Sequence, residues 1–311
     1  MLQKTVCKLI AILLTSISIA HSGIAFEEKQ PVKELVGGET KEYSIDETTT
    51  IVFCWIPPGT EQLGSTKEER QAICKSIGLD AETKELTSTS QEIRKKHTST
   101  GFWLAKYTIT QTQWNALGVA KKLECRFSST GRGASLVKGI DTTQFPVESV
   151  SWGECQSFVD NLNLLKDTNV TFGSDVKFSI PTEDQWEFAA RGGSKQHQVY
   201  HWGNEMNGIQ GNCNGDDPFG TEKIGPFLQT LTPVGTYEKQ AHHPWGLCDM
   251  SGNVWQWCVN SSATEKAKCI TRGGCWYSSA GFCTLSSRRQ YNPDSPDSEV
   301  GFRIVAIPIK K

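Results

Sequence analysis

The sequence predicts an α+β domain built from short antiparallel strands, a few helices and much irregular structure. Stretches typical of strands do not alternate with helical stretches, which argues against a parallel α/β sheet. The segment 192–245 is rich in Gly, Asn, Asp and Pro and has few apolar periods, so it is expected to be loop-like. Ten tryptophans in 311 residues can anchor the core of such a domain, because each buries a large apolar area.

The first 25 residues have the pattern of a secretory signal peptide. Lys4 and Lys8 flank the start of an apolar run, Leu9–Ala20, that is too short to span a bilayer. Small residues at Gly23 and Ala25 predict cleavage after Ala25. The pattern predicts a secreted or periplasmic protein. No later run reaches about 18 apolar residues, so no membrane span is expected.

The remainder of the chain predicts one domain with a slightly acidic balance. Residues 26–47 form an N-terminal segment, and residues 48–311 form the domain, without a Pro/Gly/Ser linker inside it. The chain has a formal net charge of −2, and removal of the two signal-peptide lysines lowers it to −4. This balance gives no basic footprint, so no nucleic-acid partner is expected.

The first half of the domain contains two predicted strands and a predicted helix. The β-branched and aromatic run Thr48–Ile56 predicts a strand, and the Pro57–Gly59 turn ends it. Lys67–Ile77 is typical of a helix. Asp80–Thr100 is polar and weakly patterned, which predicts an exposed insertion, and Phe102–Ile109 predicts the next strand.

Three helix starts are marked by capping residues. Thr110 precedes a short helix, while Ser151 with Glu154 and Thr182 with Gln185 each form a capping box. The acidic residues of the last helix are expected to favour its dipole and not to act as a catalytic pair. Further along, short strands are predicted at residues 254–257, 270–271 and 302–307.

Several motifs occur in one fixed order and together resemble the formylglycine-generating enzyme, or sulfatase-modifying factor, family. They are Trp55–Gly59, Phe102–Tyr107, Phe145–Trp152, Ile180–Arg191, Trp202–Asn204, Thr232–Gly235, Gly246–Trp257 and Thr271–Cys283. The resemblance covers most of the chain after residue 50. It implies a variant of the C-type-lectin-like fold that is stabilised by calcium. Its members oxidise a substrate cysteine to formylglycine with copper and O2.

The resemblance implies a copper site at positions four and nine after Gly274. Position nine is Cys283, which matches, but position four is Ser278, where the family has cysteine. A hydroxyl is a poor ligand for the soft Cu(I) ion, so copper is expected to bind weakly or not at all. Trp255 and Cys275 complete the candidate catalytic residues, because Cys275 stands where the family has a serine.

Three roles remain open for Cys275 and Cys283. Cys275 could replace the missing copper ligand, provided that the loop brings it to Cys283. The two cysteines could instead form a disulfide across a hairpin, since an exported chain meets oxidising conditions. They could also be two buried free thiols. Disulfide or structural roles are favoured over copper.

The resemblance also implies two calcium sites. The first set comprises the Asp249 side chain, the carbonyls of Gly252 and Val254, and Gln256, which stands where the family has Glu. The second set begins at Asn212 and Cys213. The acidic residue that the family adds later in the chain is missing near Gly225 and Phe227, and Asp216 and Asp217 could serve instead. The alternative is that these Asn and Asp residues only form turns.

Two functions follow as hypotheses. One is the family activity, the oxidation of a cysteine in an exported protein substrate such as a sulfatase. The other is a non-catalytic, lectin-like module that holds a peptide or a glycan in the same cleft. The serine at position 278 favours the second hypothesis.

Overall fold

The structure is a computed structural model that describes residues 34–76, 78, 95–118, 124–165, 168–260 and 269–309. All features below belong to the compact unit Leu35–Lys311. The predicted signal peptide and residues 80–94 of the predicted insertion lie outside the described residues. Within the described part of the chain, no helix is both long and apolar enough to cross a membrane.

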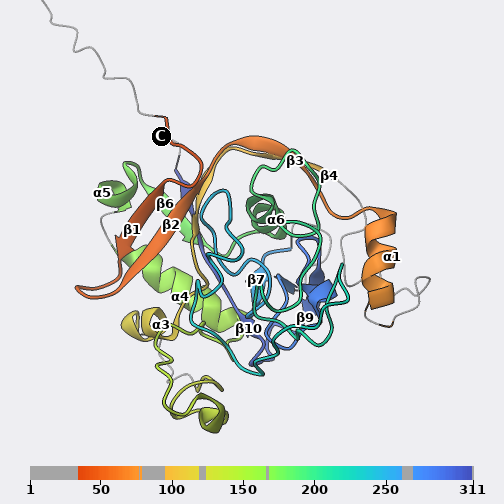
Figure 1. The fold of residues 1–311 in the computed structure, drawn as a ribbon. Coiled ribbons are helices and arrows are strands. Elements are labelled where there is room, and N and C mark those ends of the chain that lie inside the picture. The colour runs from red at the N-terminus through yellow and green to blue at the C-terminus, as the bar shows by residue number, and fades with distance from the viewer. Residues whose placement is uncertain are drawn as a thin grey trace, which may run out of the picture. The chain divides into compact units, whose positions relative to one another are not determined.

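The larger sheet has five antiparallel strands in the order β1-β2-β5-β11-β6 (Figure 1). Their bounds are Thr40–Ser44, Thr50–Ile56, Phe102–Ala105, Val305–Pro308 and Val176–Ser179. The strands predicted at 48–56 and 102–109 are confirmed, although the second ends at Ala105. β1 was missed and lies within residues 26–47, so that part of the N-terminal segment is an edge strand of the sheet.

Both faces of this sheet are buried. Successive side chains of a strand point to opposite faces. In β2, Phe53 and Trp55 pack into one hydrophobic cluster together with Trp103, whereas Cys54 and Ile56 pack into another. A run of β-branched and aromatic residues without polar alternation is what such a doubly covered strand requires.

A second sheet carries the C-terminal motifs. It has the order β10-β7-β8-β9, and its strands are Val300–Gly301, Trp255–Cys258, Cys269–Arg272 and Arg288–Tyr291. All its pairings are antiparallel except the two-residue parallel contact between β10 and β7. A two-stranded ribbon pairs β3, Gly59–Leu63, with β4, Lys95–Ser99. The end of the segment predicted as an irregular insertion is therefore a strand.

The capping residues place three helices correctly. Thr110, Ser151 and Thr182 each cap the next helix through a complete capping box. The described helices are α1 (Lys67–Ser76), α3 (Gln111–Ala116), α4 (Trp152–Leu164), α5 (Thr168–Phe172) and α6 (Glu183–Arg191). The α5 helix was not predicted. The α4 helix packs on β6, and α5 packs on β1 (Figure 1).

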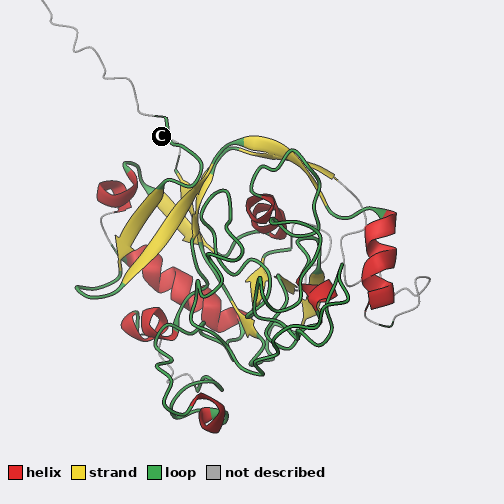
Figure 2. Cartoon of the chain, viewed as in Figure 1, coloured by secondary structure: helices red, strands yellow, loops and turns green. Residues whose placement is uncertain are grey.

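Between α6 and β7 the chain contains no helix or strand longer than isolated bridges, as predicted (Figure 2). No disulfide holds this segment, because all ten described cysteines are free thiols. Backbone bonds between distant loops organise it instead. Asn214, for example, donates to the Ser278 carbonyl at 2.9 Å.

Candidate functional site

A cleft of about 470 Å³ opens beside the second sheet, and we call it the Trp255 cleft. Its lining comes from the start of β7, the Ser278 turn, the 3-10 turn Ala280–Cys283 and β9. The lining residues are Trp255, Tyr277, Ser278, Ser279, Phe282, Arg288, Arg289 and Glu299. Two of the four predicted catalytic residues, Trp255 and Ser278, therefore meet in one cleft.

Trp255 is held with its ring in the cleft wall. Its backbone N–H donates to the Glu299 carbonyl at 2.7 Å, and the residue is 2% exposed. The indole Nε1 is buried and has no hydrogen-bond partner among the described residues. A buried indole N–H ordinarily finds an acceptor, so this donor is an exception among the buried polar groups.

The Arg-Gly-Gly motif fixes the turn that carries Ser278. Gly274 has a φ of 75°, and a Cβ there would lie 2.4 Å from the Cys283 sulfur, so only glycine fits. The Ser278 hydroxyl accepts from the Cys275 N–H at 3.1 Å and lies 3.2 Å from the Cys275 sulfur. Burial raises the pKa of the Cys275 thiol to about 12, so Cys275 is a protonated thiol at neutral pH.

Cys283 does not line the Trp255 cleft. It is fully buried, its S–H donates to the Ser279 carbonyl at 3.9 Å, and Cys213 belongs to the same buried cluster. The neighbouring Cys213 thiol, together with burial, holds the pKa of Cys283 well above its usual range. The disulfide considered between Cys275 and Cys283 is not formed in the structure, where both are free. The Ser278 hydroxyl is hydrogen-bonded to Cys275, and Cys283 lies in the buried cluster with Cys213. These residues therefore do not fit a Cu(I) ion.

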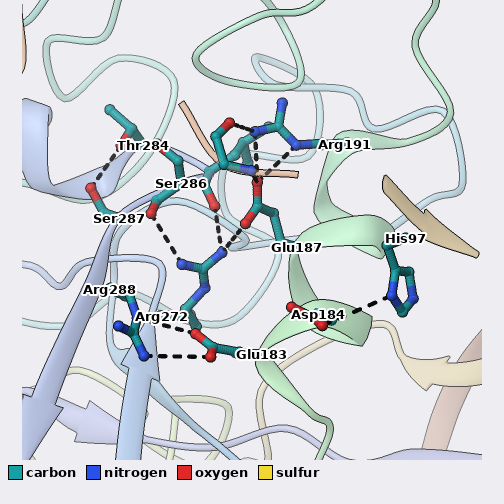
Figure 3. A network of polar contacts seen from close by, with 12 residues as sticks. His97, Glu183, Asp184, Glu187, Arg191, Arg272, Thr284, Ser286, Ser287 and Arg288 are labelled. Atoms are coloured by element: carbon teal, nitrogen blue, oxygen red, sulfur yellow. Dashed lines mark hydrogen bonds and ion pairs between the residues drawn. The ribbon is translucent and has the colours of Figure 1, made fainter. Parts of the chain in front are cut away.

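The arginine of the same motif has a structural role (Figure 3). Arg272 is fully buried and donates to Glu187 at 2.5 Å, and Arg191 donates to the other carboxylate oxygen at 2.6 Å. Arg272 also donates to the carbonyls of Leu285 and Ser286. The network therefore joins α6 to β8.

The first calcium set does not fit calcium in this arrangement. The Gln256 oxygen already accepts from Trp186 Nε1 and from Arg303 Nε, both at 2.7 Å. The Gln256 amide donates to the Asp249 carbonyl at 2.9 Å. Gln256 therefore has no oxygen free to ligate a cation. The Gly252 carbonyl accepts from the Val254 N–H at 3.0 Å.

The second set offers one free oxygen. Asn212 is buried, and its Oδ1 has no hydrogen-bond partner among the described residues, while its amide donates to the Thr230 carbonyl. Calcium prefers several oxygens that include carboxylates. No cluster of three or more His, Cys, Asp or Glu side chains that could hold a metal occurs in the described ranges. Asn212 and Cys213 by themselves therefore fit calcium poorly.

Converting Gln256 to glutamate is expected to create a calcium response that the unmodified protein lacks. A carboxylate keeps the two accepted hydrogen bonds and replaces the amide donor with an oxygen that can ligate. Ligand that binds only the native state raises the melting temperature by mass action. We expect calcium to raise the melting temperature of Gln256→Glu and to leave the unmodified protein unchanged relative to chelator. A fall on chelation in the unmodified protein would contradict this assignment.

His201 and His243, in the irregular segment between α6 and β7, have ring centroids 4.7 Å apart. His243 is buried, and it forms hydrogen bonds with the Ala190 carbonyl and the Trp245 N–H. Burial lowers the pKa of His201 to about 4 and places that of His243 well below its usual value. Both rings are therefore neutral in the folded protein at neutral pH.

Acid is expected to destabilise the protein through His201. Its folded pKa of about 4 lies below the unfolded value near 6.5, so its contribution is present above pH 6.5 and is lost as the pH falls toward 4. We expect the free energy of unfolding of the native protein to fall between pH 7 and 4.5 by about 1–3 kcal/mol more than that of His201→Gln. Urea unfolding at both pH values measures the difference. Parallel pH curves would show that His201 does not contribute.

Sequence reasoning missed two residues of the site. Cys213 was considered only as a calcium ligand, and nothing in its spacing indicated Cys283 as its neighbour. Glu299 lines the cleft beside Cys275, and burial raises the pKa of its carboxyl. Its position after the Asn292–Asp294 turn gave no signal, because β10 brings it to β7 through a two-residue contact.

Comparison with known proteins agrees with the fold and with the motifs. The family model of the sulfatase-modifying factor enzyme 1-like domain matches residues 39–307. Curated relatives include an inactive C-alpha-formylglycine-generating enzyme 2 of Bos taurus, 32% identical over 51% of this chain and 50% of its own. A formylglycine-generating enzyme of Thermomonospora curvata is 29% identical over 58% and 60%. The chaperone protein LppX of Paenibacillus barcinonensis is 26% identical over 70% and 85%.

The chain spans about half the length or less of the first curated relatives that it matches. Among solved structures, PvdO from Pseudomonas aeruginosa superposes with a TM-score of 0.60 at 15% identity, over 88% of this chain and all of that one. Treponema denticola variable protein 1 gives 0.59 at 19% identity, over 86% and 99%. At such identities the likeness concerns the fold alone.

Proposed function

Because the chain belongs to the sulfatase-modifying factor enzyme 1-like family, we propose that it is a binding member of that family which holds a peptide segment of a partner protein in the Trp255 cleft and does not oxidise cysteine. The observation that carries this proposal is the position of the sulfur atoms. Neither Cys275 nor Cys283 lines the cleft, and the position from which the family presents its first copper ligand carries Ser278.

The walls of the cleft suit a peptide. Tyr277, Phe282 and Trp255 supply aromatic residues to the lining of the cleft. The charges around the cleft are already paired, since Arg289 lies 3.4 Å from Glu299 and Arg288 lies 3.2 Å from Glu183. A segment with little net charge and at least one aromatic or apolar side chain matches these walls.

The names of relatives are compatible with this proposal. Two curated relatives are called inactive formylglycine-generating enzymes, so the domain also occurs without the activity. The relative named a chaperone protein matches over 85% of its own length, and a chaperone acts by contacting another protein. Export of this chain, which the signal-like first 25 residues favour, would place its partner outside the cytoplasm.

An oxidation assay tests the catalytic half of the proposal. The unmodified protein is loaded with Cu(I), exposed to O2 and incubated with a cysteine-containing peptide, and the peptide is analysed by mass spectrometry. We expect no conversion to formylglycine, because no thiolate pair faces the cleft. Multiple turnovers by the unmodified protein would overturn the proposal and restore the family activity.

A random-peptide display library tests the binding half. We expect the unmodified protein to enrich peptides that Tyr277→Asp does not retain, since Tyr277 is 58% exposed and lines the cleft. Ile224→Asp is the matched control, because Ile224 is 69% exposed and does not line the cleft. Equal enrichment by all three proteins, or none by any, would count against peptide binding at this site.

A further inference from the structure

The Cys213 and Cys283 thiols form a pair that the cleft does not use. Both side chains are fully buried and belong to one hydrophobic cluster together with Tyr200, Met206 and Ala280. The Cys213 thiol, together with burial, holds the pKa of Cys283 above its usual range. Cys275 is near, but its sulfur is engaged by the Ser278 hydroxyl at 3.2 Å.

The backbone on both sides of this pair is fixed. Asn214, next to Cys213, donates to the Ser278 carbonyl at 2.9 Å, and Ala280 donates to the Asp217 carbonyl at 3.0 Å. The Tyr200 hydroxyl donates to the Ala280 carbonyl at 2.7 Å and anchors the 3-10 turn that ends at Cys283. These hydrogen bonds position both cysteines in the free-thiol state, without a disulfide between them.

The surroundings favour a neutral product over a metal. Two thiolates around a Cu(I) ion carry a net negative charge, which is costly to bury, and both cysteines are 0% exposed. A disulfide is uncharged and apolar, and it occupies the space that the two thiols already fill.

We propose that Cys213 and Cys283 are a disulfide-forming pair. The bond would join the loop segment after α6 to the 3-10 turn Ala280–Cys283, whose Phe282 lines the Trp255 cleft. In the reaction one thiolate attacks a small-molecule disulfide such as oxidised glutathione, and a mixed disulfide forms as one glutathione leaves. The second cysteine then displaces the other glutathione. Two protein S–H bonds are lost and one S–S bond is gained, and the glutathione disulfide accepts the two electrons and the two protons to become two thiols.

The bond would close a loop over residues 213–283. This loop includes much of the irregular segment between α6 and β7, together with β7 and β8. A crosslink across a long loop stabilises chiefly by restricting the unfolded chain. It would also hold Cys283 as a disulfide, in which form it cannot ligate copper. The inference concerns a different pair of atoms from the peptide cleft, so it can fail while peptide binding holds, and the reverse.

The test is to refold the purified protein in a glutathione redox buffer, to block remaining thiols and to map peptides without reduction. We expect one dominant crosslink, between the Cys213 and Cys283 peptides, and a melting temperature that falls when the bond is reduced. In Cys275→Ser the crosslink and the shift should persist, whereas in Cys213→Ala both should vanish. A Cys275–Cys283 crosslink, or both thiols of the pair free after oxidative refolding, would overturn the proposal. The map of the unmodified protein decides this even where a variant does not fold.

Discussion

Replacing Glu187 with alanine is expected to destabilise the protein by about 3–5 kcal/mol, because the change leaves two buried arginines without their carboxylate. Glu187 is fully buried and accepts from Arg191 at 2.6 Å, from Arg272 at 2.5 Å and from the Gly64 N–H at 2.7 Å (Figure 3). The two arginines and the Gly64 N–H donate into its carboxylate, so the pKa of Glu187 is lowered despite complete burial. Urea or guanidinium unfolding measures the loss.

Glu238→Ala is the control for this measurement. Its carboxylate also pairs with a cation, Lys106, at 2.8 Å, but the Glu238 side chain is 41% exposed. Exposed pairs contribute about 0–1 kcal/mol, so the control should change the free energy of unfolding by no more than that. A loss below about 1 kcal/mol for Glu187→Ala as well would mean that water or rearrangement compensates the two arginines.

The role of Glu187 illustrates what the sequence could and could not predict. Capping residues and the apolar stripe placed α4 and α6 correctly, because those signals are local to each helix. Glu187 was expected only to favour the dipole of α6. One of its partners, Arg272, lies 85 positions further along the chain, and a pairing over that distance follows from the packing of α6 on β8 and not from any local pattern.

The candidate site, too, could be predicted only in part. Trp255 and Ser278 were named from the family resemblance, and both line the cleft. The Gln256–Arg303 bond and the Cys213–Cys283 contact were not predicted, since each depends on two irregular segments meeting in space. The contacts of loops that lack a hydrophobic period cannot be predicted from local sequence patterns.

Placing a thiol at position 278 and removing the Cys213 thiol beside Cys283 is expected to raise Cu(I) affinity by at least about 100-fold, or about 2.7 kcal/mol. The change is Ser278→Cys combined with Cys213→Ala. Ser278→Cys returns a sulfur to the position at which the family holds copper, and Cys213→Ala removes the thiol that now contacts Cys283. Two soft thiolates bind Cu(I) far better than a hydroxyl and a thiol committed elsewhere.

Competition with a chromophoric Cu(I) chelator measures this affinity in the unmodified protein and in the double variant. Ser279→Cys with Cys213→Ala is the matched control, because Ser279 lines the same cleft one residue further on and its hydroxyl bonds Asp217 at 3.3 Å. It adds a thiol of equal size at a position that the family does not use, so it should bind copper no better than Cys213→Ala alone. Equal affinity in the double variant and the matched control would show that any added cysteine suffices. Tight binding by the unmodified protein would show that Cys283 reaches copper despite Cys213, and either result would contradict the assignment of Ser278 as the position at which the copper site was lost.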